Sequence, residues 1–528
     1  MNLLTDPVFR VDTSNGLERL DLPGLLETMG ADRLESLPGL QRHQEDAFHI
    51  FLCYLAGAVL AREGQEDPRQ GAGFWREGIR RLTRADGGGD DGAWTLVVGD
   101  PTLPAFLQPP CPTTADFKEL ELKAKTPDGV DLLPTAKNHD LKANRVGHPE
   151  PDDWIYALIS LQTMSGVFGN GKYGIARMNS GAGSRSVVAL SYATTWGERW
   201  REHTTRIMAL RPDLLAQSWH YRSDGLVCTW IPPWDRHSSL VLSTLDPFFI
   251  EACRVVRLVG DARDIRALGA TSKSQRIAAK AANGDLGDPW IPINLKNKSA
   301  LTVSANGFTP SLLRDLIFQD GFALTGLQLP TQGRAGQHCR FTASVLVRGI
   351  GTTDGFYQAI VPIPHTSARR MFGRGPEHDR LAALSKTAIE DSGTMQNRIL
   401  KASVYSLLEA GPQQVDFEKR EVTAWWGETQ RSFAAAWSAD FFPWLWRTAE
   451  HPDLETARLE WLQALKQKAE AALTEAIARY PTRAGRRYRA QVRAQGVFHG
   501  LLRKHFPVLT PTPIDDQGET AHDDTSHS

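Results

Sequence analysis

The sequence predicts an α+β protein in which a large mixed α/β N-terminal domain (residues 1–370) precedes a C-terminal four-helix bundle (residues 380–505). Two patterns lead to this prediction. Residues 220–365 contain short runs rich in Val, Ile, Phe and Tyr that are separated by Gly, Pro and Asp, as in strands joined by turns. Residues 380–503 instead carry apolar residues at helical spacing in about four long segments.

The N-terminal region is expected to mix helices with short extended pieces. Residues 1–40 are predicted to form short strands and turns, and Trp94–Val98 a further strand. Apolar residues recur at helical spacing over Gln41–Arg62, which predicts a long buried helix, and Gly73–Thr83 predicts a second. Residues 113–150 have few apolar anchors and many charged residues, so they are predicted to form a long exposed loop.

A glycine-rich stretch, Met164–Arg185, lies between helices predicted over Asp152–Met164 and Glu198–Leu210. Glycine lets a backbone come close to a ligand, and backbone amides combined with cations suit a polyanion. Gly169–Gly174 spells GxGxxG, but a dinucleotide-binding loop needs a strand before it and a helix after it, whereas here a helix precedes. A mobile surface loop and a loop that docks against a nucleic-acid groove are the other two interpretations.

A basic segment interrupts the strand-rich region. Lys273, Arg276 and Lys280 are spaced three and four apart, which would align them on one helical face, although a solvated face is the simpler interpretation. Arg348–Phe356 lies between two strand patterns and predicts the tip of a β-hairpin. Residues 366–380 are predicted to be a linker.

The helical segments of the C-terminal region are predicted over Leu381–Glu409, Asp416–Thr448, Leu454–Tyr480 and Arg486–Leu501. Prolines fall at or near the breaks between them, and Pro443 is expected to interrupt the second segment. The tail, residues 513–528, is acidic and polar and is predicted to be disordered.

Near the end of the predicted bundle, arginines are dense and acidic residues are few. This basic patch comprises Arg483, Arg486, Arg487, Arg489 and Arg493. A solvated helix face and a phosphate-contacting patch that holds a nucleic-acid strand explain this density about equally well.

Composition points to a globular protein of the cytoplasm. The 60 Lys and Arg residues nearly balance 61 Asp and Glu residues, so nucleic-acid binding would depend on local patches. Five scattered cysteines without a CxxC pair argue against a structural zinc site and for a reducing compartment. The N-terminus lacks the features of an export signal, and no apolar segment has the length of a membrane helix.

No motif for catalysis stands out. His43 and His49 flank Glu45 and Asp46 on a helix whose apolar face is continuous, and His139–Asp140 lacks the spaced partners that a metal site needs. The sequence contains no GxSxG, no HExxH and no carboxylate cluster suited to two metals. Nothing in the sequence therefore points to an enzyme, a cofactor or a metal site.

Several motifs occur in an order that carries a family resemblance. They are the opening MNLLTDPVFRV, the runs Asp131–Pro134 and Asn138–Leu141, the stretch GVFGNGKYGIARMN, and Gly287–Pro292. In this order, and with the helical C-terminal region, they resemble the CasA family, the large subunit of the type I-E CRISPR surveillance complex Cascade. The resemblance covers nearly the whole chain.

The resemblance implies a non-catalytic subunit that reads the protospacer-adjacent motif (PAM) of double-stranded DNA, largely from the minor groove. Such a subunit starts strand separation and R-loop formation in antiviral defence, acts with crRNA and the other Cascade subunits, and recruits a separate helicase–nuclease. Guide pairing reads the sequence in complexes of this kind, so the protein reads only a short motif. Minor-groove readout is degenerate, so several motifs would be tolerated.

The resemblance also assigns the DNA-reading elements. The glycine loop corresponds to Phe168, Gly169, Asn170, Gly171 and Lys172, with Lys172 near a phosphate. Lys280 is the first candidate for a lysine finger and Lys273 is the second. The wedge hairpin corresponds to Gly351, Thr352, Thr353, Asp354 and Gly355; because family members carry a glutamine at this tip, Gln332 is the alternative wedge residue.

On the RNA side, the resemblance implies a long loop that contacts the crRNA, with Lys137, Asn138, His139, Asp140 and Lys142 as the contacting residues. Some family members carry a four-cysteine zinc site in the middle region, but Cys253 is the only cysteine between residues 229 and 338, so no zinc is expected. Two other functions stay open: a nucleotide-dependent or hydrolytic enzyme that uses the Gly169–Gly174 loop, and a scaffold subunit that only holds RNA.

Overall fold

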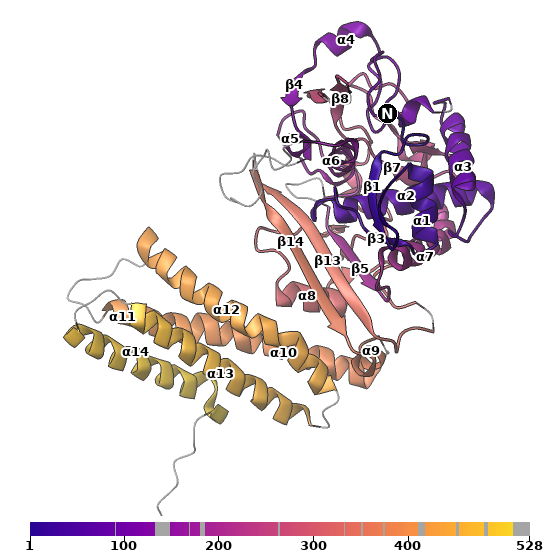
Figure 1. The fold of residues 1–528 in the computed structure, drawn as a ribbon. Helices are drawn as coiled ribbons and strands as arrows, with labels where there is room; N and C mark the ends of the chain where they lie inside the picture. Colours follow the sequence, from indigo (N-terminus) through magenta and orange to yellow (C-terminus); the bar gives the residue numbers. More distant parts are fainter. Residues whose placement is uncertain are drawn as a thin grey trace, which may run out of the picture. The chain divides into compact units, whose positions relative to one another are not determined.

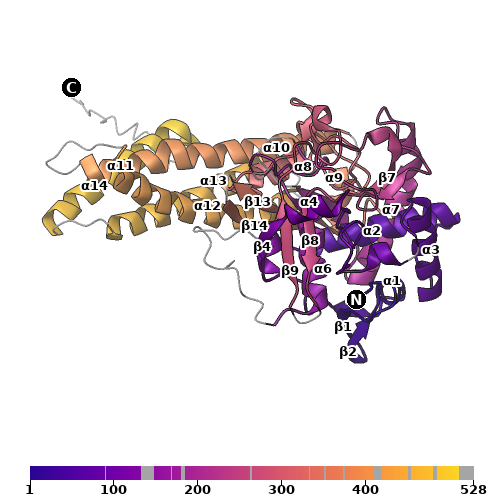
Figure 2. The same ribbon diagram turned by 90° about the horizontal axis from the view of Figure 1, so that it is seen from above.

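The computed structural model describes residues 1–89, 91–131, 148–167, 169–179, 185–261, 264–331, 333–349, 352–372, 375–409, 418–449, 453–479 and 484–509. The chain divides into two compact units, Met1–Gly373 and Arg374–Ser528. The first unit mixes helices with small sheets, and the described part of the second is built from helices (Figure 1 and Figure 2). This confirms the predicted α+β class. In the described ranges, no helix is long and apolar enough to cross a bilayer.

A buried helix, α2 (Glu45–Glu63), lies at the centre of the N-terminal unit, and its residues from Ala47 to Leu60 are all buried. Three further helices pack against it: α3 (Ala72–Ala85), α6 (Pro151–Met164) and α7 (Trp196–Ala216). All four were predicted, and for α2 and α6 the prediction came from apolar residues that recur at helical spacing over several turns.

The first forty residues contain strands β1 (Phe9–Thr13), β2 (Gly16–Leu20) and β3 (Leu34–Ser36), together with a helix, α1 (Leu22–Gly30). The helix was not predicted, because Pro23-Gly24 resembles a turn. Asp21 caps it by accepting the Gly24 N–H at 2.7 Å, and Pro23 lies in the first turn, where no backbone hydrogen bond is lost.

The strand predicted over Trp94–Val98 is wrong. Gly92–Trp94 forms a single 3-10 turn, and the following residues pass through the core as irregular chain. Their backbone groups bond to the N-terminus instead of to a sheet, with Leu3 N–H donating to the Trp94 carbonyl at 3.0 Å.

Residues 113–131 are also structured, contrary to the exposed loop predicted there. They form α4 (Thr114–Lys118), β4 (Glu121–Ala124) and α5 (Asp128–Asp131). Asp131 is fully buried and accepts from His43 at 2.8 Å and from Gln44 at 2.9 Å. A charged residue can be buried here because both partners lie on the chain leading into α2, a contact that local sequence does not reveal.

Small sheets build the rest of the N-terminal unit. Strands β5 (Val187–Ser191), β13 (Cys339–Gly349) and β14 (Thr352–Ile363) form an antiparallel sheet in the order β14-β13-β5, which confirms the predicted hairpin. The other strands are β6 (Leu226–Cys228), β7 (Leu245–Ile250), β8 (Val255–Val259), β9 (Arg266–Ala270), β10 (Ile293–Asn294), β11 (Ser299–Ala300) and β12 (Phe322–Ala323). One short helix, α8 (Pro310–Ile317), precedes β12.

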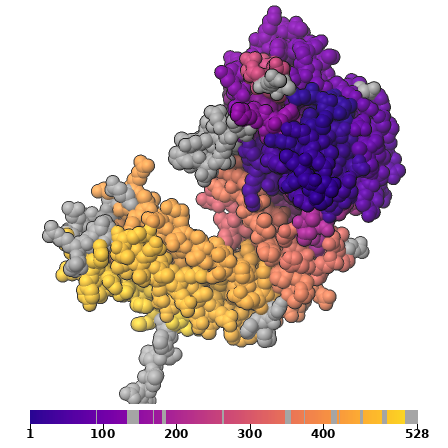
Figure 3. Space-filling view, in the orientation of Figure 1, coloured from indigo at the N-terminus to yellow at the C-terminus, as the bar shows by residue number. Residues whose placement is uncertain are grey.

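The linker predicted over residues 366–380 is mostly helical. The first unit ends with α9 (His365–Phe372), and α10 (Pro376–Thr394) begins the second. A π-helical turn, Met395–Leu400, joins α10 to α11 (Lys401–Glu409). The unit continues with α12 (Arg420–Ala449), α13 (Leu454–Arg479) and α14 (Ala484–His505), and α13 and α14 form its yellow surface in Figure 3.

Pro443 lies inside α12, so the predicted interruption is wrong. A proline removes one backbone hydrogen bond from a helix. Aromatic packing around this position compensates: Trp444 and Phe441 lie 4.8 and 5.8 Å from the Trp461 ring of α13, measured between ring centroids. Residues 510–528, including the tail predicted to be disordered, lie outside the described residues.

Candidate functional site

The glycine loop leaves the end of α6 and returns on itself. The Ile175 N–H donates to the Ser165 carbonyl at 3.0 Å and closes the base of the loop, while Lys172 N–H donates to the Gly169 carbonyl at 3.1 Å and forms a turn at its tip. No helix follows the GxGxxG residues within 169–179, where the chain forms turns and irregular structure. This geometry lacks the strand–loop–helix arrangement of a dinucleotide-binding site.

The glycines of the loop meet different surroundings. Gly169 (φ 105°) faces open space, whereas Gly171 (φ 71°) is packed so closely that an added Cβ would lie 2.9 Å from the Ser272 carbonyl oxygen. Gly169 and Asn170 are exposed, and Lys172 is half-buried. Phe168, the remaining predicted loop residue, lies outside the described residues. The tip therefore offers backbone and one amide side chain to a ligand.

The basic segment, residues 271–280, is irregular chain with several bends up to the 3-10 turn that begins at Lys280, so the predicted helical face is wrong. It runs beside residues 236–240: Leu240 N–H donates to the Arg276 carbonyl and Ala278 N–H to the Leu240 carbonyl, both at 2.8 Å. Lys273 and Lys280 are exposed at its two ends. Below, this stretch is called the lysine segment.

Arg276 is a structural residue of the lysine segment, not a third exposed cation. Its side chain is buried, donates to the carbonyls of Thr229 and Pro232 at 2.8 Å each, and lies 5.4 Å from the Trp234 ring centroid. Burial lowers the pKa of Arg276 to about 10, which leaves the guanidinium charged at neutral pH. It holds the segment against the body of the unit.

The glycine loop contacts the lysine segment near Lys273, and the stretches of chain that follow these two elements meet near Lys280. Near Lys273, the Ser272 N–H donates to the Gly171 carbonyl at 2.9 Å, and the Tyr173 hydroxyl donates to the Lys273 carbonyl at 3.2 Å. Near Lys280, Gly284 (φ 83°) is packed so closely that an added Cβ would lie 2.8 Å from the Asn179 nitrogen. The two predicted elements therefore form one surface.

A buried charge cluster lies at the base of the loop. Arg177 and Arg185, which flank the undescribed residues 180–184, both pair with Asp288, with the Arg177 contact at 3.8 Å. Glu251 accepts the Ala176 N–H at 2.7 Å, and burial raises the pKa of its carboxyl to about 7 despite the nearby guanidinium of Arg177. Sequence reasoning missed this cluster; its local signal is that two arginines stand within a glycine-rich stretch.

The hairpin assigned to the wedge belongs to the same unit. Its strands are in register from the Cys339–Ile363 pair to the Gly349–Thr352 pair, with a bulge between Val347 and Arg348. Bulges sharpen the local twist and redirect a strand end. Of the predicted wedge residues, Gly351 lies outside the described residues. Strand β14 begins with Thr352, Thr353 and Asp354, and Gly355 (φ 150°) in the same strand pairs with Val347. Gln332, the alternative wedge residue, is also undescribed.

Short contacts connect the hairpin to the lysine segment. The Tyr357 hydroxyl on β14 donates to the Ala305 carbonyl at 2.6 Å, and Ala300 N–H, earlier in the same loop region, donates to the Asn283 carbonyl at 3.0 Å. Asn283 closes the 3-10 turn that carries Lys280. The glycine loop, lysine segment and hairpin are thus linked through one continuous set of contacts.

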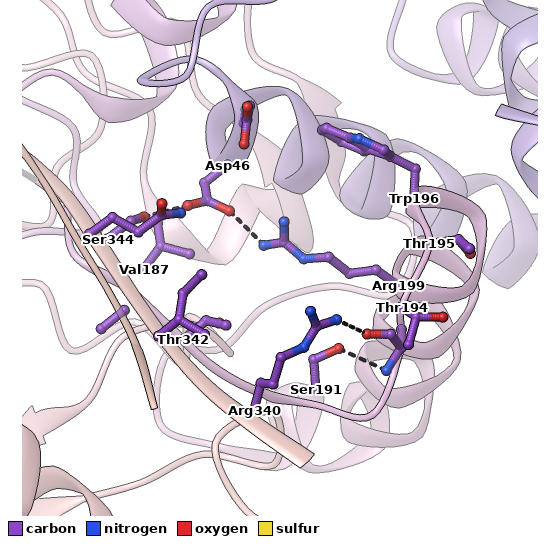
Figure 4. A pocket seen from close by; sticks show the side chains of 15 residues that line it. Asp46, Val187, Ser191, Thr194, Thr195, Trp196, Arg199, Arg340, Thr342 and Ser344 are labelled. Carbon is purple, nitrogen blue, oxygen red and sulfur yellow. Dashed lines mark hydrogen bonds and ion pairs between the residues drawn. The ribbon is translucent and has the colours of Figure 1, made fainter. Parts of the chain in front are cut away.

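A cavity of about 210 Å³ lies over one face of the β14-β13-β5 sheet, beside the first turns of α2 and α7 (Figure 4). Asp46 binds Arg199 at 2.5 Å and Ser344, while Arg340 extends into the cavity from β13. Its described lining residues include no histidine or cysteine, and the Ser344 hydroxyl donates to the Asp46 carboxylate, which is also paired with Arg199. Among the residues that the structure covers, no group of three metal-ligating side chains is close enough to hold an ion.

The remaining predicted residues lie elsewhere. The crRNA-contacting residues Lys137, Asn138, His139, Asp140 and Lys142 are outside the described residues, as is Arg483. In the second unit, Arg486, Arg487, Arg489 and Arg493 are exposed on α14, and Arg493 pairs with Glu409 at 2.8 Å. The exposure of these arginines fits both a solvated helix face and a phosphate-contacting patch.

Comparison with known proteins gives matches by structure only. No family model and no curated protein sequence matches the chain. The solved structure of CasA from Thermus thermophilus is 16% identical, with 96% of this chain and 99% of that chain covered and a TM-score of 0.60. Cse1 from Acidimicrobium ferrooxidans is 15% identical (97% and 99% covered, TM-score 0.62), and Cse1 from Thermobifida fusca is 16% identical (97% and 99% covered, TM-score 0.60). Over nearly its whole length the chain has the fold of CasA and Cse1, which confirms the predicted likeness at the level of fold.

Proposed function

We propose that this chain is the large subunit of a type I-E Cascade surveillance complex and recognises a PAM in double-stranded DNA without catalysing a reaction. The observation that supports this most is the joining of the glycine loop to the lysine segment, at Gly171–Ser272 and Tyr173–Lys273, in a chain with the CasA and Cse1 fold. Two elements that are about a hundred residues apart in sequence form one exposed surface, as a groove-reading site requires.

The chemistry of that surface suits a DNA groove. Gly169 and Asn170 are exposed, so backbone can approach the groove closely while the Asn170 amide offers a donor and an acceptor to base edges. Lys273 and Lys280 are exposed beside them and supply charge to flanking phosphates. Within the described residues, neither lysine pairs with a carboxylate, so both charges are available to phosphates.

The hairpin then acts as the wedge. Its tip follows the bulge at Val347–Arg348, and its stalk contacts the loop region that leads back to Lys280. A duplex bound through its PAM on the lysine segment would thus meet the hairpin at its neighbouring base pairs. The opened target strand pairs with crRNA, and the complex recruits a separate helicase–nuclease for antiviral defence.

The test is duplex binding by the complex reconstituted with crRNA and its partner subunits. Asn170→Ala should weaken binding of a PAM-bearing duplex by about tenfold, because a base-edge contact is worth roughly 1–3 kcal/mol. Lys280→Ala should weaken binding and lower the slope of log K against log[salt] by about 0.9, because it removes a phosphate contact. Both variants should leave assembly unchanged. Lys296→Ala, which removes an exposed lysine at the β10–β11 turn, is the matched control. If both variants fail to assemble, or assemble and bind the duplex normally, the proposal is wrong.

A further inference from the structure

Arg236 adopts an unusual backbone conformation beside the lysine segment. Its φ is 67°, in the left-handed region that non-glycine residues rarely occupy. Holding an L-residue there carries an energetic cost, so the surrounding contacts must determine the conformation. Strained residues of this kind concentrate at functional sites, which makes the contacts of Arg236 informative.

The turn that contains Arg236 is rigidly built. The Asp235 carboxylate accepts from the N–H of Ser238 at 2.7 Å, from the Ser238 hydroxyl at 2.7 Å and from the N–H of His237 at 2.8 Å. These hydrogen bonds, led by that from the Ser238 N–H, lower the pKa of Asp235 to about 2, so the carboxylate stays ionised and the turn stays closed at physiological pH. The turn therefore fixes the direction of the Arg236 carbonyl.

That carbonyl holds the lysine segment. It accepts from the Lys273 N–H at 2.7 Å and from the Ser274 N–H at 3.3 Å. Since the Lys273 carbonyl in turn accepts from the Tyr173 hydroxyl, the position of Arg236 sets the position of Lys273 relative to the glycine loop. Lys273 is thereby fixed through both of its peptide groups, and only its side chain is left to move.

The side chain of Arg236 points to a different element. Its guanidinium binds Glu119, the C-cap residue that follows α4, and lies 3.8 Å from Asp116 within that helix. The Arg236 side chain is 18% exposed, against 62% for Glu119. Arg236 therefore contacts α4 and its cap through its side chain and the lysine segment through its backbone carbonyl. The chain from α4 continues through β4 and α5 to residue 131, and the residues assigned to crRNA contact begin at Lys137.

We propose that Arg236 is a positioning residue for duplex recognition: by bridging α4 to the lysine segment, it holds Lys273 in place against the glycine loop. This deepens the proposed function and rests on it for its DNA readout. Arg236 does not itself contact DNA in this scheme. Its contribution is to prevent the lysine segment from moving when Lys273 engages a phosphate, so that binding does not require the segment to be ordered first.

Hydrogen exchange on the full-length chain tests the bridge without DNA. Arg236→Ala and Glu119→Gln should each speed exchange of the Lys273 and Ser274 amides about two- to fivefold, as expected for a partly exposed ion pair. The double variant should be no faster than Arg236→Ala alone, because both changes break the same link. Arg222→Ala, which breaks an exposed pair with Asp224 at 2.8 Å, is the control and should leave these amides unchanged.

Duplex binding by the assembled complex gives the second readout. Arg236→Ala should weaken binding by a similar factor with the salt dependence of wild type, whereas Lys273→Ala should lower the slope of log K against log[salt] by about 0.9. A reduced slope for Arg236→Ala would mean direct phosphate contact and would overturn the positioning role, as would unchanged exchange or additive effects in the double variant. A different result would refute the proposed function itself: the wild-type complex would not prefer a PAM-bearing duplex over one without a PAM, whatever the hydrogen-exchange result.

Discussion

Replacing Gly171 by alanine should separate the glycine loop from the lysine segment. Gly169→Ala is a closely matched control, because both glycines have positive φ, 71° and 105°, and both substitutions carry a backbone strain of roughly 1–2 kcal/mol. Only at Gly171 does the new Cβ meet other atoms: Thr271 Cβ at 2.7 Å and the Ser272 carbonyl oxygen at 2.9 Å, while at Gly169 nothing lies within 4 Å.

The magnitude follows from these distances. Ordinary contact begins at 3.4 Å, so the glycine loop and the lysine segment must move apart by 3.4 − 2.9 = 0.5 Å at the Ser272 carbonyl oxygen. The same displacement, taken along the Ser272 N–H to Gly171 carbonyl bond, would stretch it from 2.9 Å to about 3.4 Å, which is beyond the usual range. Losing that bond costs roughly 1 kcal/mol, which is about a fivefold change in an opening equilibrium.

Hydrogen exchange of residues 271–274 is the appropriate assay, because it reports on the junction in the free protein. Gly171→Ala should raise exchange of the Ser272 amide about fivefold beyond any change in Gly169→Ala. Melting temperatures of the two variants should remain similar, since both carry the backbone strain. Equal exchange in the two variants would refute the argument that close backbone approach at Gly171 joins the two elements.

Two further predictions concern stability. Arg276→Ala should lower the unfolding free energy by about 3 kcal/mol or more, because it leaves the Thr229 and Pro232 carbonyls without their donor, whereas Lys273→Ala should change it by less than about 0.5 kcal/mol; urea denaturation would measure both. The buried pair His49–His203, 2.9 Å apart, has both pKa values held well below 6.5, chiefly by burial. Because the folded state resists protonation, the pair's stabilisation is present above pH 6.5 and is lost below it by about 1.4 kcal/mol per histidine per pH unit. His203→Gln should therefore lose less stability than wild type between pH 7 and pH 5, and an equally steep loss would contradict the neutral pair.

The elements that sequence reasoning predicted well are those whose signal is long and local. Helix α2 is buried continuously from Ala47 to Leu60, and α13 repeats buried positions from Ala457 to Ile477, so no single contact decides the outcome. Helix α1 has nine residues and depends on one cap, the Asp21 carboxylate on Gly24 N–H, so its Pro-Gly pair suggested a turn. Short elements depend on individual contacts and are therefore harder to predict from periodicity.

The lysine segment shows why spacing alone misleads at the site. Lys273, Arg276 and Lys280 fit one face of a helix, and nothing local indicates that the segment is irregular. Its conformation is set by pairing with residues 236–240 and by carbonyls at Thr229 and Pro232 that attract the Arg276 guanidinium. An arginine can enter a core when carbonyl groups replace its water, and that depends on residues about forty positions away. The same applies to Asp288, which is buried because Arg177 and Arg185 reach it.

The glycine stretch itself combines two different requirements that sequence cannot separate. An added Cβ at Gly174 would lie 2.8 Å from the Gly166 carbonyl carbon, and one at Gly171 would strike the lysine segment, so both glycines serve contacts inside the protein. Gly169 alone among these three meets open space, and it stands beside the exposed Asn170. A duplex that approaches the loop should therefore be read at Gly169–Asn170, while Gly171 and Gly174 give the loop its shape and bring it to Lys273. The GxGxxG spelling therefore does not require a bound phosphate, because close approach of one protein backbone to another also favours glycine, as at Gly171 and Gly174.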